Sequence, residues 1–589
     1  MSDVAGVGWW GEKPSPSLAW GRRLAASWAS TLGAALVLGL GVGAAPAAGQ
    51  QMDHAGHRMP MAEGAWRMPP MDPNMPMLPG LEMALPPVAP FLAAAGIDIS
   101  TLPEARPSEV VEMAGGDTLD VDVSIVRRTL NGHEMAMYGY NGQYPGPLIQ
   151  APQGSTVVVR VTNRIESPTT VHWHGVRLDN AFDGVPGLTQ APIEVGETFV
   201  YDVKVPDAGM FWYHPHVRED VQQDLGLYGN LLVTPPDPEY FGPAHREEVL
   251  VLDDILMDEA GAIPWGEEAP THALMGRFGT VMLVNGETDH GLDVRPGEVV
   301  RFYMTNVANT RTFNVTFGEA RVKLVGSDVG RYERETWVQS VVIAPAERYV
   351  VDVQFPEEGP VVIANSIQAV NHFRGEFYPH VDTLAVVTVG GDPAEGSTAD
   401  GYEDLRENAA VVAELDPLRA HAGREPEYTL ETTVRVNGLP LPIVVSMEID
   451  TLYVPPMEWN DAMPMMNWLS TGDQVTWILR EAGTGRENGD IAWTFDEGDL
   501  VKIRVFNDPD SFHPMNHPIH VHGQRFVVLA RDGMANDNLV WKDTAIVPVG
   551  STMDILVEMS NPGDWMLHCH IAEHLHAGMM FDFTVRPAP

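Results

Sequence analysis

Short runs of alternating apolar and polar residues occur along most of the chain, separated by turns rich in glycine and proline, and no long segment has helical periodicity. Three runs share one form: a glycine turn, an alternating strand, and an asparagine nine residues after the glycine. They are residues 151–163, 294–306 and 495–507. The pattern predicts an all-β chain of three homologous Greek-key β-sandwich domains.

A second repeated spacing supports the same alignment of the three copies. Gly209 and Gly563 are each followed five residues later by a histidine, whereas Gly359 is followed by Ala364. The middle copy therefore keeps the strand and lacks the histidine. We place domain 1 at residues 110–236, domain 2 at 245–395, a charged and alanine-rich linker with some helix at 396–424, and domain 3 at 425–589.

The chain carries 80 acidic and 36 basic residues, which argues against nucleic-acid binding and for a soluble, cation-attracting surface. Residues 1–49 resemble an export signal, in which Arg22-Arg23 precedes an apolar run that ends in small residues. The adjacent arginines match a twin-arginine signal in part. A membrane-spanning segment is the alternative, but the run contains Ser27, Ser30 and Thr31. We expect cleavage, no stable membrane span, and a periplasmic or secreted protein.

The single cysteine of the chain, Cys569, lies between His568 and His570. In a strand, residues i and i+2 share one face and residue i+1 points to the other, so the two histidines can serve one metal site and Cys569 a second. A thiolate, His574 and the thioether of Met579 are three of the four ligands of a blue-copper site. The fourth, an imidazole, is expected from residues 517–523. One strand would then connect two copper centres.

Pairs of the form His-x-His occur five times, whereas 21 histidines placed at random would give about 0.7. The pairs are His172/His174, His214/His216, His520/His522, His568/His570 and His574/His576. The first four form two groups far apart in sequence. Their imidazoles, which suit copper, could hold a cluster of three copper ions.

In their order, these histidine segments resemble the four copper motifs of the multicopper oxidases, and the resemblance covers roughly residues 115–589. It implies three cupredoxin-like domains, a bacterial laccase or cuprous oxidase, and four copper ions. The implied ligands are His517, Cys569, His574 and axial Met579 for type 1 copper; His172 and His520 for type 2; and His174, His214, His216, His522, His568 and His570 for the type 3 pair. The three-copper cluster would lie between domains 1 and 3, with domain 2 as a spacer.

The resemblance also implies the reaction. A reductant gives single electrons to type 1 copper, Cys569 and its two neighbours pass them to the cluster, and O2 is reduced to two waters. Asp183 and Glu573 match the acids of the family's proton relay; the alternative for either is a solvated surface carboxylate. A thioether at Met579 predicts a low-to-middle potential, the alternative being that it only fills the core.

Two methionine-rich segments bear on the reductant, one within residues 50–109 and one an insertion at 447–467. Thioethers favour Cu(I), so these segments suggest that the protein handles copper. The expected electron donor is Cu(I), or a phenol or aromatic amine. The alternative for the segments is a disordered tail or a flexible apolar cover. Copper nitrite reductase is disfavoured because it lacks the type 3 pairs. A copper-sequestering resistance protein on a cupredoxin scaffold is the rival from another class. Five histidines match no motif and are expected to be ordinary: His290, His372, His380, His513 and His576.

Overall fold

The structure is a computed structural model that describes residues 91–588, except 267, 356, 372–375, 395, 397, 399–400, 438–456 and 460–471. The predicted export signal at 1–49 lies outside the described residues. So do the methionines of the first methionine-rich segment, His372, and all of the predicted 447–467 insertion except residues 457–459.

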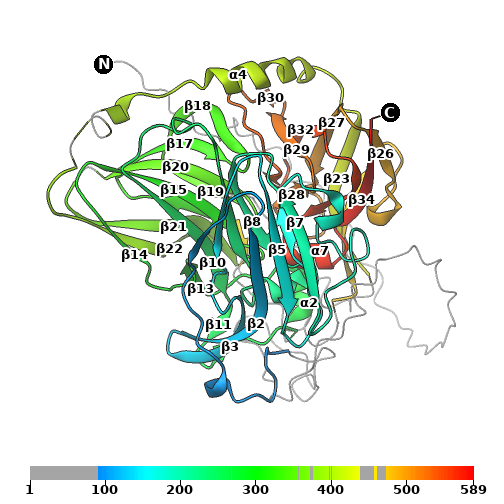
Figure 1. Cartoon of the computed structure of the whole chain (residues 1–589). Helices are drawn as coiled ribbons and strands as arrows, with labels where there is room; N and C mark the ends of the chain where they lie inside the picture. The colour runs from blue at the N-terminus through cyan, green and yellow to red at the C-terminus, as the bar shows by residue number, and fades with distance from the viewer. Residues whose placement is uncertain are drawn as a thin grey trace, which may run out of the picture. The chain divides into compact units, whose positions relative to one another are not determined.

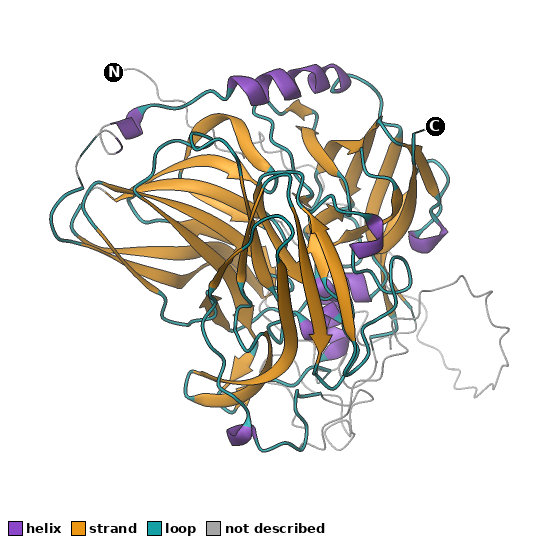
Figure 2. Ribbon diagram, viewed as in Figure 1, coloured by secondary structure: helices purple, strands orange, loops and turns teal. Residues whose placement is uncertain are grey.

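Strands make up most of the described chain, which confirms the predicted all-β class (Figure 2). A first pair of sheets uses residues 110–234, with strand orders β1-β4-β9-β8-β6 and β3-β2-β5-β7. Its strands are β1 (Val110–Glu112), β2 (Thr118–Leu130), β3 (His133–Tyr140), β4 (Leu148–Pro152), β5 (Thr156–Asn163), β6 (His172–His174), β7 (Thr198–Lys204), β8 (Gly209–His214) and β9 (Gly229–Thr234).

A second pair of sheets has the orders β13-β10-β15-β20-β17-β18 and β14-β22-β21-β16-β19. Its strands are β10 (Arg246–Ile255), β13 (Val281–Val284), β14 (Gly291–Val294), β15 (Glu298–Asn306), β16 (Phe313–Thr316), β17 (Arg321–Ser327), β18 (Gly330–Val338), β19 (Ser340–Ile343), β20 (Arg348–Phe355), β21 (Gly359–Asn371) and β22 (Glu376–Val389). A small hairpin joins β11 (Met257–Asp258) to β12 (Gly261–Ala262). The described part of the methionine-rich insertion, β24 (Met457–Trp459), adds to this pair by running parallel to β21.

A third pair of sheets has the orders β25-β23-β27-β32-β29-β30 and β26-β34-β33-β28-β31. Its strands are β23 (Tyr428–Val436), β25 (Val475–Glu481), β26 (Trp493–Asp496), β27 (Asp499–Asn507), β28 (His517–Val521), β29 (Arg525–Arg531), β30 (Met534–Ala535), β31 (Thr544–Val547), β32 (Thr552–Met559), β33 (Gly563–Cys569) and β34 (Met580–Arg586). The described α-helices are short: α1 (Glu219–Gln222), α2 (Ala269–Met275), α4 (Ala409–Leu415) and α7 (Ala572–His576).

Strands β5, β15 and β27 end at the three phased asparagines, Asn163, Asn306 and Asn507, all fully buried. In each case the side-chain amide donates hydrogen bonds to two backbone carbonyls at 2.7 to 2.9 Å. Buried carbonyls need such partners, because an unpaired one costs about 1–3 kcal/mol. The same residue therefore closes the same corner in all three pairs of sheets.

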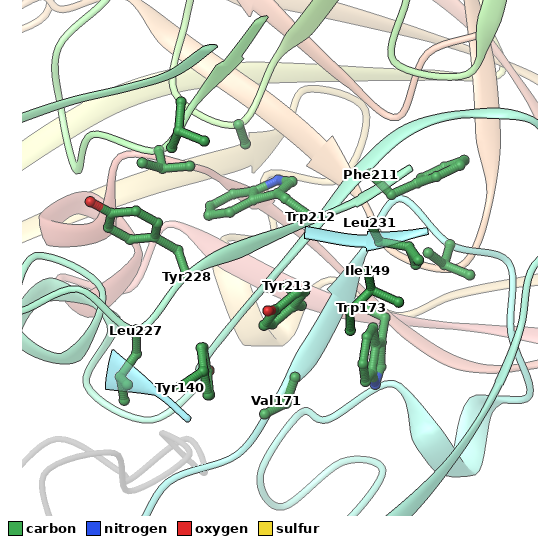
Figure 3. Close-up of a cluster of buried hydrophobic side chains, with 14 of the residues drawn as sticks. Tyr140, Ile149, Val171, Trp173, Phe211, Trp212, Tyr213, Leu227, Tyr228 and Leu231 are labelled. Atoms are coloured by element: carbon green, nitrogen blue, oxygen red, sulfur yellow. The ribbon is translucent and has the colours of Figure 1, made fainter. Parts of the chain in front are cut away.

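Strand β8 is buried along its whole length, so both of its faces pack against protein. Its alternation directs Tyr213 into the core, 5.4 Å from the ring of Trp173, and directs Trp212 toward His214, whose ring lies 4.2 Å away. Figure 3 shows Trp212 and Tyr213 on their strand, with Trp173 near Tyr213. This aromatic packing fixes the strand that carries the first histidine group.

The segment expected to be a linker contains helix, as predicted. Helix α4 continues into the 3-10 turn Asp416–His421, packs on β18, and buries Leu415 completely (Figure 1). The indole of Trp541 also donates a hydrogen bond of 2.8 Å to Glu414. Among the described residues, no helix has the length and apolarity needed to cross a membrane.

Candidate metal centres

The first centre is built around Cys569, the last residue of β33. Its Sγ lies 3.5 Å from Nδ1 of His517 and 3.9 Å from Nδ1 of His574, and all three residues are buried. His517 begins β28, which pairs with β33 so that Ile519 faces Cys569; His517 therefore lies on the face that Cys569 occupies. His574 comes from α7, where the ring of Trp477 stacks on it at 3.9 Å.

Two backbone hydrogen bonds hold Met579 beside this group. Its N–H donates to His574 at 3.0 Å, and its carbonyl accepts from Cys569 at 3.1 Å. Met579 is fully buried in the same apolar cluster as Cys569, whereas Met580 belongs to a separate small cluster with Val185. The geometry thus favours Met579 over its neighbour as the fourth member of this centre.

Burial also sets the protonation of the first centre. It lowers the pKa of His517 to about 3 and raises the pKa of the Cys569 thiol well above its usual range. The imidazole is therefore neutral, as a metal ligand must be, while the thiol needs a bound cation to lose its proton. A thiol and two neutral imidazoles fit a soft metal ion such as copper.

The second centre collects all eight histidines of the first four His-x-His pairs, which are buried. Three overlapping groups have ligand nitrogens within 4.8 Å of one another: His172/His520/His522, His172/His174/His214 and His216/His522/His568. His570 completes the set, with its ring 4.8 Å from that of His174 and 5.1 Å from that of His214. One half comes from β6 and from the end of β8 and the residues after it, where His172 pairs with His214. The other half comes from the ends of β28 and β33 and the residues after them, where His520 pairs with His568.

In seven of these rings, one nitrogen is held by an oxygen. The contacts are His172 Nδ1 to the Asp183 carbonyl (2.7 Å), His174 Nε2 to Thr544 Oγ1 (3.0 Å), His214 Nδ1 to the Pro215 carbonyl (2.9 Å), His216 Nδ1 to Glu219 (2.7 Å), His520 Nδ1 to the Asp543 carbonyl (2.9 Å), His522 Nδ1 to Asp183 Oδ2 (2.9 Å) and His568 Nδ1 to the Cys569 carbonyl (2.9 Å). Metal-binding histidines are oriented in this way by an acceptor on the far nitrogen.

The opposite nitrogens supply the donor set. Those of His172, His174, His214, His216 and His520, and Nε2 of His570, are buried without a hydrogen-bond partner among the described residues. Those of His522 and His568 lie 3.0 Å from each other. Burial, and then the neighbouring imidazoles, lower the pKa of His520 and His522 far below the usual value, so the rings are neutral. Unpaired, neutral, converging imidazole nitrogens fit a cluster of copper ions.

Both predicted acids are buried, and Asp183 contacts this cluster. Asp183 is fully buried and accepts a hydrogen bond from His522, and Glu573 is buried and accepts from Asn309 Nδ2 at 3.1 Å and Thr310 Oγ1 at 2.9 Å. Burial, opposed by these hydrogen bonds, raises the pKa of Glu573 to about 7. Neither residue is the solvated surface carboxylate that the sequence left as an alternative.

Several residues that contact the predicted ligands and acids were not predicted. Asp543 and Thr544 contact His174, and Asn309 and Thr310 of the second pair of sheets hold Glu573. No motif marks them, because each touches the site through a contact between distant segments. Of the histidines expected to be ordinary, His513 is buried, His576 is exposed, and His380 lies 3.0 Å from Asp382.

Two sequence-family models, both described as multicopper oxidase, match residues 122–238 and 460–589 and so include every predicted ligand. The chain belongs to the multicopper oxidase family. Multicopper oxidase MmcO of Mycobacterium tuberculosis is 28% identical over 489 residues, which cover 77% of this chain and 84% of the relative. Laccase-1 of Cryptococcus neoformans var. grubii is 26% identical over 545 residues, which cover 84% of each chain.

The multicopper oxidase from Campylobacter jejuni, described as a metallo-oxidase, has a similar structure. The TM-score is 0.61 at 20% identity, covering 84% of this chain and 99% of the other. This likeness confirms the cupredoxin-like β-sandwich fold. Family membership makes the chain a laccase-like copper oxidase, an oxidoreductase that uses O2 and a reducing substrate.

Proposed function

We propose that this multicopper oxidase is exported and couples four one-electron oxidations to the reduction of O2 to two waters. His517, Cys569, His574 and Met579 would hold type 1 copper. His172 and His520 would hold type 2 copper, and the remaining six histidines, His174, His214, His216, His522, His568 and His570, the type 3 pair. Bound copper supplies one-electron redox chemistry at the first centre and a place for O2 at the second.

The observation that carries the proposal is the alternation at the end of β33. The side chain of Cys569 lies with His517 and Met579, while His568 and His570 lie among the eight histidines. Three consecutive residues therefore join the two centres by covalent bonds. An enzyme that accepts single electrons at one centre and uses them to reduce O2 at another needs such a path for electron transfer.

The buried residues around both centres exclude bulk water and orient the donors. Carbonyl, carboxylate or hydroxyl oxygens contact one nitrogen in seven of the eight rings, so the other nitrogen is free to bind metal without reorganisation. Asp183 and Glu573 would deliver the protons that water formation requires. Asp183 contacts His522 directly, and Glu573 precedes His574 in sequence.

The donor is proposed to be Cu(I), or a phenol or aromatic amine. The two methionine-rich segments support Cu(I), since thioethers are soft ligands. Deleting residues 52–83 should then weaken Cu(I) oxidation and leave small-phenol oxidation intact; equal loss of both, or loss of neither, would remove the Cu(I) role of this segment.

Oxygen consumption tests the function itself. Copper-loaded protein should consume O2 with dimethoxyphenol or with Cu(I), and steady-state rates with Cu(I), Fe(II), Mn(II) and dimethoxyphenol would rank the donors. A protein with its full copper content and no O2 uptake with any of the four would favour copper sequestration instead.

A further inference from the structure

The second pair of sheets was predicted to be only a spacer, but one of its arginines lies beside the histidine cluster. Arg348, the first residue of β20, is fully buried and forms a two-point ion pair with Asp543, with Nη1 2.7 Å from Oδ1 and Nη2 in contact with Oδ2. Asp543 directly precedes β31 of the third pair of sheets. The guanidinium thus bridges two pairs of sheets beside the cluster.

Asp543 in turn contacts two of the predicted ligands. Its Oδ1 lies 3.1 Å from Nε2 of His174, and its backbone carbonyl lies 2.9 Å from Nδ1 of His520. The two rings, from the first and third pairs of sheets, stack with centroids 3.8 Å apart. These contacts occupy the outer nitrogens and leave His174 Nδ1 and His520 Nε2 as the nitrogens that can bind metal.

The place of Asp543 depends on Arg348. A buried carboxylate without a cation beside it is strongly unfavourable. Among the described residues, Arg348 is the only cationic side chain that contacts both carboxylate oxygens of Asp543. Arg348 is fixed in its own position by the carbonyl of Met210, 2.8 Å from Nε, and by Asp328, which accepts from its backbone N–H at 2.8 Å. A planar guanidinium held at several points sets both the distance and the angle of the carboxylate.

We propose that Arg348 is a positioning residue for the cluster: it sets Asp543, and through Asp543 the ring orientations of His174 and His520. This inference rests on the proposed function and extends it, because it gives the second pair of sheets a part in copper binding. The hydrogen bonds of Arg348 at the cluster go to the Asp543 carboxylate, which in turn contacts His174.

The test compares Arg348→Lys with Arg301→Lys. Arg301 is a matched control, because it is buried in the same sheet and makes a similar two-point pair with Asp352, at 2.8 and 2.9 Å. Lysine keeps the charge and loses the two-point geometry. Each copper-loaded variant is measured for copper content, for the blue absorption of type 1 copper, and for the electron paramagnetic resonance spectrum of type 2 copper.

We expect Arg348→Lys to bind type 2 copper about 10- to 100-fold more weakly, with an altered type 2 spectrum, while the blue absorption stays at the wild-type level. Arg301→Lys should change neither signal. Asp543→Asn, which keeps the shape of the side chain, should reproduce the type 2 effect and covers the case in which Arg348→Lys does not fold.

Unchanged type 2 affinity and spectrum in Arg348→Lys and Asp543→Asn, beside a normal wild-type signal, would overturn the inference alone. Equal loss of type 1 and type 2 copper in both variants would also overturn it, since that is the mark of a merely structural role. A wild-type protein without any type 2 signal would instead refute the proposed function, and the inference with it.

Discussion

Replacing Gly175 with alanine tests how tightly the ion pair beside the cluster is packed. Gly175 follows His174 and has a φ of +79°, which costs an L-residue about 1–2 kcal/mol. An added Cβ would lie 2.2 Å from Asp543 Oδ2 and 2.9 Å from Arg348 Nη2, so the carboxylate must move. Overpacking of this kind costs about 1–3 kcal/mol more. We therefore expect Gly175→Ala to lower the free energy of unfolding by about 2–5 kcal/mol.

Gly154→Ala is the matched control. Its φ is +81°, but no atom of the described structure lies within 4 Å of the added Cβ, apart from the neighbouring residues. It should cost only the backbone strain of about 1–2 kcal/mol. Urea unfolding of the copper-free proteins measures the loss of stability in both variants. Because copper is absent, the measurement reports packing and not metal binding. Equal losses of stability in the two variants would refute the packing argument.

Three further substitutions test other parts of the account. Cys569→Ser should abolish the blue absorption and leave the copper of the histidine cluster in place, because the thiolate serves only the first centre. Glu573→Gln should reduce turnover about 100-fold with the blue absorption unchanged, because the glutamine cannot release a proton. Asn163→Ala should lower the free energy of unfolding by about 2–5 kcal/mol, since the Ser167 carbonyl and the Ile165 N–H lose the partner that Asn163 gives them and the Ile193 carbonyl keeps only the Thr169 N–H.

Each of these three substitutions has a control variant or a result that would contradict the prediction. A Cys569→Ser protein that stays blue would remove the assignment of the first centre. Glu335→Gln, a buried acid of the second pair of sheets, should leave turnover unchanged; the same loss there would mean a general effect of burial. Gln153→Ala, an exposed side chain that donates to one carbonyl, should cost less than about 1 kcal/mol, and a cost equal to that of Asn163→Ala would contradict the corner argument.

The ligand residues could be predicted from sequence because their arrangement is local. A strand has a period of two, so His568, Cys569 and His570 must point alternately to two sites wherever the strand lies. The phased glycines and asparagines likewise predicted the strands β5, β15 and β27, whose ends the structure shows at the asparagines.

The supporting residues could not be predicted in this way. Arg348 and Asp543 are 195 residues apart, and Thr310 and Glu573 are 263 apart, so their contacts exist only once the pairs of sheets have packed. The site of β24 is a similar case. The insertion was placed within domain 3 by its position in the chain, yet residues 457–459 pair with β21 of the second pair of sheets.

The most direct measurement of the central claim is anomalous diffraction at the copper edge from crystals of the copper-loaded protein. The account predicts one copper ion among His517, Cys569 and His574, and three more enclosed by the eight histidines of the second centre. Copper at the first centre with none among the eight histidines, or copper bound only outside both centres, would contradict it.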